Sequence, residues 1–284
     1  MQESKPRAVA FGEVLFDCFA DNVCLGGAPL NFAWHLNQLG IPVAVLSAVG
    51  RDELGASVQS LLARAGIISW IGERSEPTGT VDVRVVDGEP AFDIHKNVAW
   101  EYIELPEKVR VAPELVYLGT VAQGSQLNRA SLRKLLALGP RHILFDVNLR
   151  PGFAFREIVL DGLKQASILK DSAAEWSAIR KLVRLETPAQ VLACFDLEMM
   201  AITLGAEGAE LHVPGGVFRS AAPRVEVLDS VGAGDAFCAA LVAGLLRGVS
   251  LQRTLQAATE IAAFTVQRRG AQVELPATLC RLFK

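Results

Sequence analysis

Short apolar runs alternate with amphipathic segments along most of the chain. Residues 9–16 and 43–48 are short and mostly apolar, which predicts strands. Residues 29–39 and 55–65 space their apolar side chains three and four apart, which predicts helices. The rhythm continues with a strand at 115–118, a helical face at Leu132, Leu135 and Leu136, and strands at 142–147 and 199–204. This order favours a largely parallel sheet with helices on both faces.

One segment departs from this rhythm. Residues 80–86 alternate between apolar and polar, Asp87 and Gly88 tolerate positive φ, and residues 91–96 resume an extended pattern. The segment therefore predicts a β-hairpin, which either decorates a sheet edge or covers a site. No linker, low-complexity tract or fixed repeat marks a domain boundary. We expect a single domain over residues 1–284.

Composition narrows the class of protein. The 284 residues are 51% hydrophobic and 21% charged, and 28 basic against 31 acidic residues give a net charge of −3. Without a basic cluster, binding to nucleic acid is not expected. The five cysteines are scattered without CxxC spacing, so neither a zinc site nor a disulfide framework is indicated. With no signal peptide and no run near the roughly 20 apolar residues that span a bilayer, we expect a cytoplasmic protein without a membrane partner.

The strongest chemical signal is the segment 229–235, Asp-Ser-Val-Gly-Ala-Gly-Asp, after which apolar residues recur every four positions. A helix that begins here leaves its first backbone N–H groups unpaired at the positive end of its dipole, which makes an anion cradle. The missing side chains of Gly232 and Gly234 would admit a phosphate, and Asp235 could accept a proton from a substrate hydroxyl. The alternative is a tight turn in which Asp235 only favours the helix N-terminus.

A second glycine-rich helix start lies near the N-terminus. Gly26 and Gly27 precede a proline suited to the first helical position, and Asn31 then offers a donor and an acceptor to hydroxyl groups. Asp17 follows the first predicted strand, at the sheet edge where ligands collect. A plain turn and a loop carboxylate are the alternatives. His35 is expected to be a partly exposed helix residue.

These two motifs, in this order, resemble the two signatures of the ribokinase-like, or PfkB, sugar kinases. Three further segments match the family: FDVNLRP at 145–151, TLGAEG at 203–208 and RGA at 269–271. Residues 12–17 and 26–31 are most similar to bacterial fructokinases. The resemblance implies a ribokinase-like, Rossmann-type three-layer α/β/α sandwich with a mostly parallel sheet and a small β lid, inserted at about 17–25 and 79–101.

The resemblance also implies the transfer of the γ-phosphate of ATP to a sugar hydroxyl. The implied catalytic set comprises Asp235 as base, the backbone of Gly232, Ala233 and Gly234 as anion hole, and Arg150 beside the phosphate path. The positions that match sugar contacts are Asp17, Gly27 and Asn31. The lid segments imply water exclusion during transfer and suggest pairing between two subunits, so a homodimer is expected.

Nucleotide and ion positions follow from the same resemblance. The residues that match the ATP site are Ser172, Glu175, Thr203, Gly205 and Gly208. The family's NxxE motif has Asn where this chain has Ser172, and Glu175 is the acidic residue expected to act on Mg²⁺ through water. A potassium site is implied at the stretch containing Asp229, Val231, Thr265, Arg268 and Gly270.

The choice of substrate stays open at this point. The subfamily resemblance favours fructose, while ribose, 2-keto-3-deoxygluconate, another ketose or a nucleoside are alternatives. A catalytically silent sugar-binding relative is a further alternative, which the presence of Asp235 and its glycines opposes. A nicotinamide-dependent oxidoreductase would need GxGxxG directly after the first strand, where this chain has Gly12 and Glu13.

Overall fold

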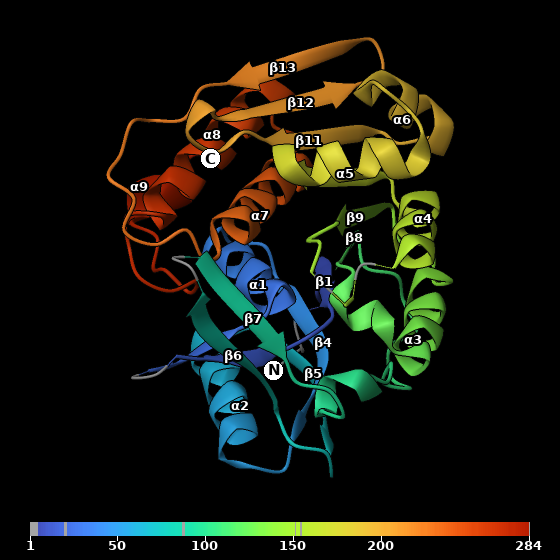
Figure 1. The fold of residues 1–284 in the computed structure, drawn as a ribbon, viewed down its shortest axis with the longest axis vertical. Helices are drawn as coiled ribbons and strands as arrows, with labels where there is room; N and C mark the ends of the chain where they lie inside the picture. Colours follow the sequence, from blue (N-terminus) through green and yellow to red (C-terminus); the bar gives the residue numbers. More distant parts are fainter. Residues whose placement is uncertain (1–4, 20–21, 87–88, 151, 154, 284) are drawn as a thin grey trace.

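The computed structural model of the protein describes residues 5–19, 22–86, 89–150, 152–153 and 155–283. Its centre is a nine-stranded sheet (Figure 1). In spatial order the strands are β13 (Gly216–Ser220), β12 (Ala209–Val213), β11 (Met199–Thr203), β10 (Ile168–Ser172), β9 (His142–Asp146), β8 (Leu115–Leu118), β1 (Ala8–Phe11), β4 (Val43–Gly50) and β5 (Ile68–Arg74). The strands from β11 to β5 pair in parallel, and β12 and β13 pair antiparallel.

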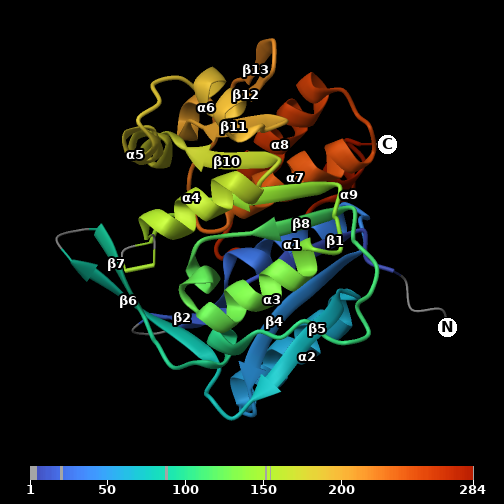
Figure 2. The same ribbon diagram turned by 90° about the vertical axis from the view of Figure 1, so that its right-hand side faces the viewer.

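Helices cover both faces of this sheet (Figure 2). One face packs on α1 (Ala28–Gln38), α2 (Glu53–Ala65), α7 (Ala233–Leu246), α8 (Leu251–Thr265) and α9 (Ala277–Cys280). The other packs on α3 (Gln126–Leu136), α4 (Arg156–Gln165), α5 (Ala173–Val183) and α6 (Pro188–Phe195). The three-layer α/β/α arrangement expected from the sequence is confirmed. The strand order reverses between β1 and β8, and ligands in such sheets bind beyond the carboxyl ends of strands at such a switch point.

The first predicted strand is wrong as a single element. β1 ends at Phe11, and β2 (Leu15–Cys18) leaves for another sheet. The break is at Gly12, where a Cβ would lie 2.7 Å from Cγ of Pro29. The start of α1 therefore occupies the space that a continuing strand would need, and this long-range contact is absent from the local apolar pattern.

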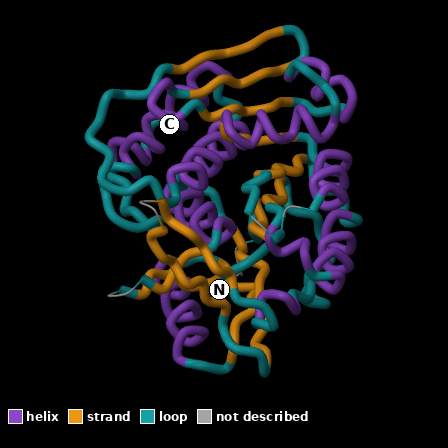
Figure 3. The backbone as a smooth tube through the Cα atoms, viewed as in Figure 1, coloured by secondary structure: helices purple, strands orange, loops and turns teal. Residues whose placement is uncertain are grey.

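The second sheet has the order β3 (Val23–Gly26), β2, β6 (Gly79–Val86) and β7 (Glu89–Ile94). In the view of Figure 3 its strands overlap those of the large sheet, whereas Figure 2 shows β6 and β7 extending away from that sheet. The predicted hairpin is confirmed as the antiparallel pair β6–β7, while its expected turn at 87–88 lies outside the described residues. A small core beside η1 (Ala99–Tyr102), containing Trp100 and Val81, joins this sheet to the rest of the molecule.

Among the helices in the described part of the chain, none is both long enough and apolar enough to cross a lipid bilayer.

Candidate active site

The two glycine-rich helix starts meet at the carboxyl ends of the central strands. Asn31 on α1 donates a 2.8 Å hydrogen bond from Nδ2 to Oδ2 of Asp235 on α7, across 204 positions of sequence. Both side chains are buried. The Asn31 Oδ1 atom accepts a hydrogen bond from Nε2 of Gln272, so the amide has a fixed orientation and in turn fixes the Asp235 carboxylate.

The turn before α1 is pressed against the bend between β1 and β2. Gly27 has φ +103°, and a Cβ there would lie 2.5 Å from the carbonyl oxygen of Glu13. At Gly26 a Cβ would lie 2.7 Å from Oδ2 of Asp17. Burial raises the pKa of Asp17, and the positive charge of Arg150 acts against this increase. Asp17 and the glycine turn that precedes Asn31 are therefore brought together.

The two glycines of the turn before α7 have different neighbours. Gly232 has φ +78°, and its missing side chain makes room for Ala271, whose Cβ would be 2.6 Å from a Cβ at Gly232. The Cβ side of Gly232 is thus filled by protein. At Gly234 a Cβ would lie 3.1 Å from the Lys170 ammonium nitrogen. The Lys170 ammonium therefore lies directly beside this turn.

Asp235 is a weak acid for a carboxyl group. Burial, with a further contribution from the charge of Asp146, raises its pKa to about 7, against the hydrogen bond from Asn31 and the charges of Lys170 and Arg150. A carboxylate with this affinity for protons is matched to proton transfer near neutral pH.

A cavity of about 430 Å³ opens beside this turn, between β11, α7 and α8. The predicted residues Thr203, Gly205 and Gly208 line it, together with Ala233 and Gly234. Its walls are largely apolar, with contributions from Val225, Val227, Phe237, Ala262 and Val266. The cavity therefore joins the TxGxxG segment to the start of α7.

Ser172 and Glu175 form the capping box of α5. The Glu175 carboxylate accepts hydrogen bonds from the backbone N–H of Ser172, at 2.8 Å, and of Leu149, at 2.9 Å. These contacts, with the charge of Lys170, lower the pKa of Glu175 against its burial. Ser172 takes the N-cap position, and Glu175 ties α5 to the segment that carries Arg150.

Asp229 connects the two parts of the chain that are predicted to bind potassium. Its carboxylate accepts hydrogen bonds from the backbone N–H of Val231 at 3.0 Å and of Gly270 at 2.9 Å. The carbonyl oxygen of Thr265 accepts a hydrogen bond from the Arg268 N–H at 3.0 Å. Within the described ranges, no group of three or more His, Cys, Asp and Glu residues is arranged to hold a metal ion.

Comparison with known protein families identifies the family of this chain. The family model described as pfkB family carbohydrate kinase matches residues 5–278. The chain belongs to the PfkB carbohydrate kinases. The fructokinase of Escherichia coli is 30% identical over 276 residues, covering 89% of both chains. A sugar kinase of Pyrococcus horikoshii, solved in complex with ATP, is 27% identical with a TM-score of 0.81, covering 93% of this chain and 94% of that one.

The fold of this PfkB kinase also matches the ATP-bound fructokinase of Xylella fastidiosa, with a TM-score of 0.86, 22% identity and 94% coverage of both chains. The ribokinase-like α/β fold expected from the sequence is confirmed, and the enzyme is a sugar phosphotransferase.

Sequence reasoning missed several residues of the kinase site. Lys170 left one signal, a lysine within the otherwise apolar start of β10, because a lysine is rarely buried unless it is paired. Ala271 lies in the RGA segment that matches the family, whereas Gln272 left no signal. His35 was expected to be partly exposed, but it is fully buried and donates a 2.9 Å hydrogen bond from Nε2 to the Ala271 carbonyl. Burial lowers its pKa to about 4, so His35 is neutral at physiological pH.

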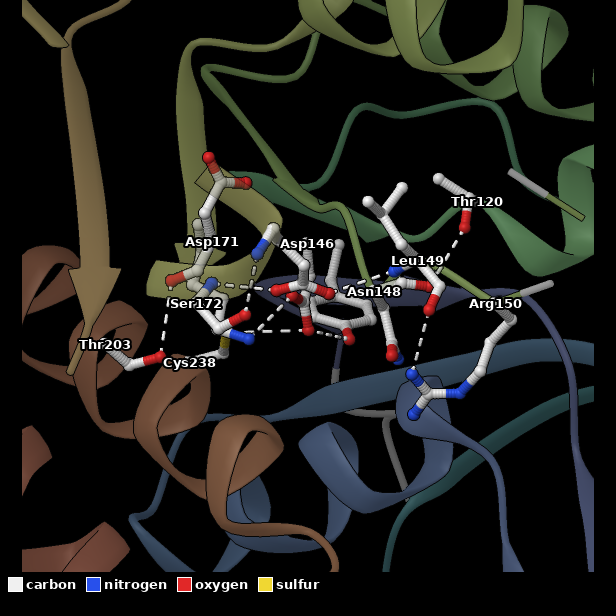
Figure 4. A network of polar contacts seen from close by, with 12 residues as sticks. Thr120, Asp146, Asn148, Leu149, Arg150, Asp171, Ser172, Thr203 and Cys238 are labelled. Atoms are coloured by element: carbon white, nitrogen blue, oxygen red, sulfur yellow. Dashed lines mark hydrogen bonds and ion pairs between the residues drawn. The ribbon is translucent and has the colours of Figure 1, made fainter. Parts of the chain in front are cut away.

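Asp171 in the same kinase is a buried carboxyl whose two oxygens have no hydrogen-bond partner among the described residues. It points away from Asp146 and Cys238 in Figure 4. Burial raises its pKa well above the ordinary value, and the charge of Glu175 adds to the effect. The folded kinase therefore holds a proton on Asp171 that the unfolded chain releases above about pH 4.

We therefore expect Asp171→Asn to stabilise the kinase, by an amount that grows with pH. The folded-state pKa is raised, so wild-type stability falls as pH rises from the unfolded pKa towards the folded one. The free energy of unfolding of the wild type decreases by up to about 1.4 kcal/mol per pH unit in this range. The Asp171→Asn variant does not show this decrease, because its amide does not titrate. Urea unfolding at pH 5, 6, 7 and 8 measures the difference, with Asp161→Asn, an exposed acid on α4, as control. A difference independent of pH would contradict the assignment.

Proposed function

We propose that this kinase transfers the γ-phosphoryl group of ATP to a hydroxyl of fructose, with Asp235 as the catalytic base. The observation that carries the proposal is the hydrogen bond between Asn31 and Asp235. It joins the motif expected to bind the sugar to a carboxylate of the first turn of α7 whose pKa is near 7.

ATP is assigned to the 430 Å³ cavity. Its apolar walls suit an adenine ring, and Thr203, Gly205 and Gly208 would contact the nucleotide. The cavity ends at Ala233 and Gly234, so the phosphates would extend towards the N-terminus of α7. The backbone N–H groups of residues 232–234 would then receive the oxygens of the transferred phosphoryl group.

The sugar is assigned to the pocket of Asp17, Gly27 and Asn31. Carboxylate and amide oxygens accept hydrogen bonds from hydroxyl groups, and Gly27 lets the backbone approach closely. Arg150 lies near Asp17 and Asp235, where a guanidinium can neutralise charge that develops on phosphate oxygens. The identity to E. coli fructokinase supports fructose as the acceptor.

A divalent cation is needed because the site is acidic. Its carboxyls are Glu13, Asp146, Glu175 and Asp235, and the cations acting on Asp235 are Lys170 and Arg150. ATP adds further negative charge. Mg²⁺, which keeps several waters, would be held through the phosphates and through water on Glu175, and supplies charge neutralisation. The oxygen donors at Asp229, Val231, Thr265, Arg268 and Gly270 suit K⁺, a hard cation.

Asp235 takes the proton of the acceptor hydroxyl as that oxygen attacks the γ-phosphorus, and the bond from the γ-phosphorus to the β,γ-bridging oxygen breaks, so that ADP leaves. The transition state is loose, so positioning and charge neutralisation contribute more than early proton removal. The second sheet, with segments 17–25 and 79–101, is assigned as a lid of this single domain that excludes water during transfer. Its edge strand β3 carries Val23, which is 52% exposed, and this supports pairing of two lids in a homodimer.

An assay of ATP consumption over a panel of acceptors tests the proposal. With Mg²⁺ present, we expect the highest kcat/KM with fructose, compared with ribose, 2-keto-3-deoxygluconate, other ketoses and nucleosides. Chelation should abolish turnover, and potassium should raise it. A higher kcat/KM with another acceptor would replace fructose as the proposed substrate, while phosphoryl transfer from ATP would remain the proposed reaction. Sugar binding without phosphorylation of any acceptor would identify a catalytically silent relative.

A further inference from the structure

A buried ion pair lies directly behind the first turn of α7. Lys170 on β10 and Asp146 on β9 are register partners in adjacent parallel strands. The ammonium nitrogen of Lys170 lies 3.0 Å from Oδ1 of Asp146, and their side chains are 8% and 1% exposed. Although burial alone would lower it, the Asp146 charge raises the pKa of Lys170. A charged lysine, paired with Asp146, therefore lies beneath the proposed anion hole.

Tyr117 on β8 holds the other oxygen of Asp146. Its hydroxyl donates a 2.9 Å hydrogen bond to Oδ2, so the carboxylate is fixed at both oxygens. The Tyr117 ring stacks on Phe32 of α1, with centroids 4.3 Å apart. Figure 4 shows Asp146 at the centre of these contacts. A continuous set of packed side chains thus runs from the helix that carries Asn31 to the cation behind Gly234.

The position of Lys170 depends on Gly234. The ammonium nitrogen lies 3.1 Å from where a Cβ of residue 234 would be, so a side chain there would displace it. A charge this deeply buried is weakly screened, so it acts strongly on the turn and on Asp235. A buried ion pair is poor evidence for a stabilising role, since apolar residues of similar volume stabilise a fold equally well.

We propose that Asp146 and Tyr117 are positioning residues that fix the Lys170 ammonium behind the Gly232–Gly234 turn. There the positive charge of Lys170 stabilises the transferred phosphoryl group. It also offsets the negative charge of Asp146 near Asp235, the proposed catalytic base. The inference rests on the proposed function and adds a source of charge to it. Lys170 acts from behind the backbone as a fixed charge rather than as a ligand of the nucleotide.

The two members of the pair act on Asp235 with opposite signs. Asp146 raises the pKa of Asp235, whereas Lys170 lowers it. The other groups that face Asp235 are Arg150, which lowers its pKa, Asn31, which donates a hydrogen bond to it, and Glu13, Tyr117 and Cys238, whose own pKa values Asp235 raises. Because those groups are unchanged when one member of the pair is replaced, each replacement shifts the titration of Asp235 in a defined direction.

The test is the pH dependence of kcat/KM for Asp146→Asn and Lys170→Met, with the acceptor that the wild-type enzyme prefers. Asp146→Asn should move the acidic limb to lower pH, because it removes an anion near the base. Lys170→Met should move the limb to higher pH and lower kcat by on the order of 100-fold, the cost of removing one stabiliser of developing charge. If the ion pair had only a structural role, the acidic limb would stay at its wild-type pH in both variants.

The matched control is Glu114→Gln, the same chemical change in a carboxylate paired with Arg7 at the opposite end of β8. It should leave both the limb and kcat unchanged. Tyr117→Phe keeps both charges and should lower kcat by a smaller factor, without moving KM for the sugar. Unshifted limbs and wild-type kcat in the two pair variants would overturn the inference.

If a single replacement prevents folding, the double variant Asp146→Asn/Lys170→Met leaves no unpaired buried charge and is measured instead. In the double variant the two opposite shifts of the acidic limb should largely cancel, but the positive charge of Lys170 is still lost. A folded double variant with low kcat therefore supports the inference. Wild-type kcat in that variant would exclude it. An inactive wild-type enzyme on every acceptor would instead contradict the proposed function, so the two failures are distinguishable.

Discussion

Asp235→Asn is expected to lower kcat by about 10²–10⁴-fold, the usual contribution of a positioned general base. The amide keeps the shape of the side chain and an oxygen that accepts the hydrogen bond from Asn31. KM for ATP should change little, because the assigned nucleotide cavity does not include the Asp235 side chain. Steady-state kinetics with varied ATP and varied sugar separate the two effects.

The pH profile gives an independent measurement of the same residue. With a pKa of about 7, Asp235 is protonated at lower pH, so wild-type kcat/KM should fall below about pH 7. The residual activity of Asp235→Asn should lack this acidic limb. Asp161→Asn, which removes an exposed carboxylate from α4, serves as control and should behave as wild type. Retention of more than about a tenth of wild-type kcat in Asp235→Asn or Asp235→Ala would rule out a base role.

The sequence was informative where local chemistry determines structure. The alternation of strands and helices predicts the parallel sheet, and the period-two pattern of residues 80–86 predicts β6. The glycine motifs predict two helix starts, and the carboxyl ends of parallel strands share one edge of the sheet. That geometry brings Asn31 and Asp235 together although the pattern says nothing about their hydrogen bond.

The sequence was uninformative where one segment fills space left by another. The break after β1 depends on Pro29, which occupies the position that a side chain at residue 12 would take. The burial of His35 depends on the Ala271 carbonyl, 236 positions away. Such contacts come from the packing of α1 and α7 against the closing segment, so no local period or spacing encodes them.

Gly232 shows how the two kinds of information combine. Its motif predicts a turn, and its φ of +78° explains why glycine is needed there. The contact with Ala271 adds a second requirement that only the tertiary structure reveals. A glycine in this position serves the docking of residues 270–273 as well as the proposed anion hole, because the same segment holds His35 through Ala271 and Asn31 through Gln272.

Gly232→Ala is therefore expected to lower kcat by about 100-fold or more, the effect of misplacing catalytic groups by about 1 Å. The new Cβ would lie 2.6 Å from that of Ala271, and the two carbons must separate by about 1 Å to reach van der Waals contact. That movement displaces the start of α7 and with it Asp235. Kinetics and urea unfolding of the same preparation measure the loss of activity and of stability.

Gly139→Ala is the matched control, since it separates backbone strain from the contact. Gly139 has φ +79°, almost identical to that of Gly232, but no atom lies within 4 Å of its Cβ position. Both substitutions carry the cost of a left-handed residue, about 1–2 kcal/mol, whereas only Gly232→Ala meets Ala271. If strain alone mattered, the two variants would lose equal stability and both would keep wild-type kcat. A larger loss of stability at Gly232, together with the loss of kcat, would assign the effect to the packing of Ala271 against the turn that carries Asp235.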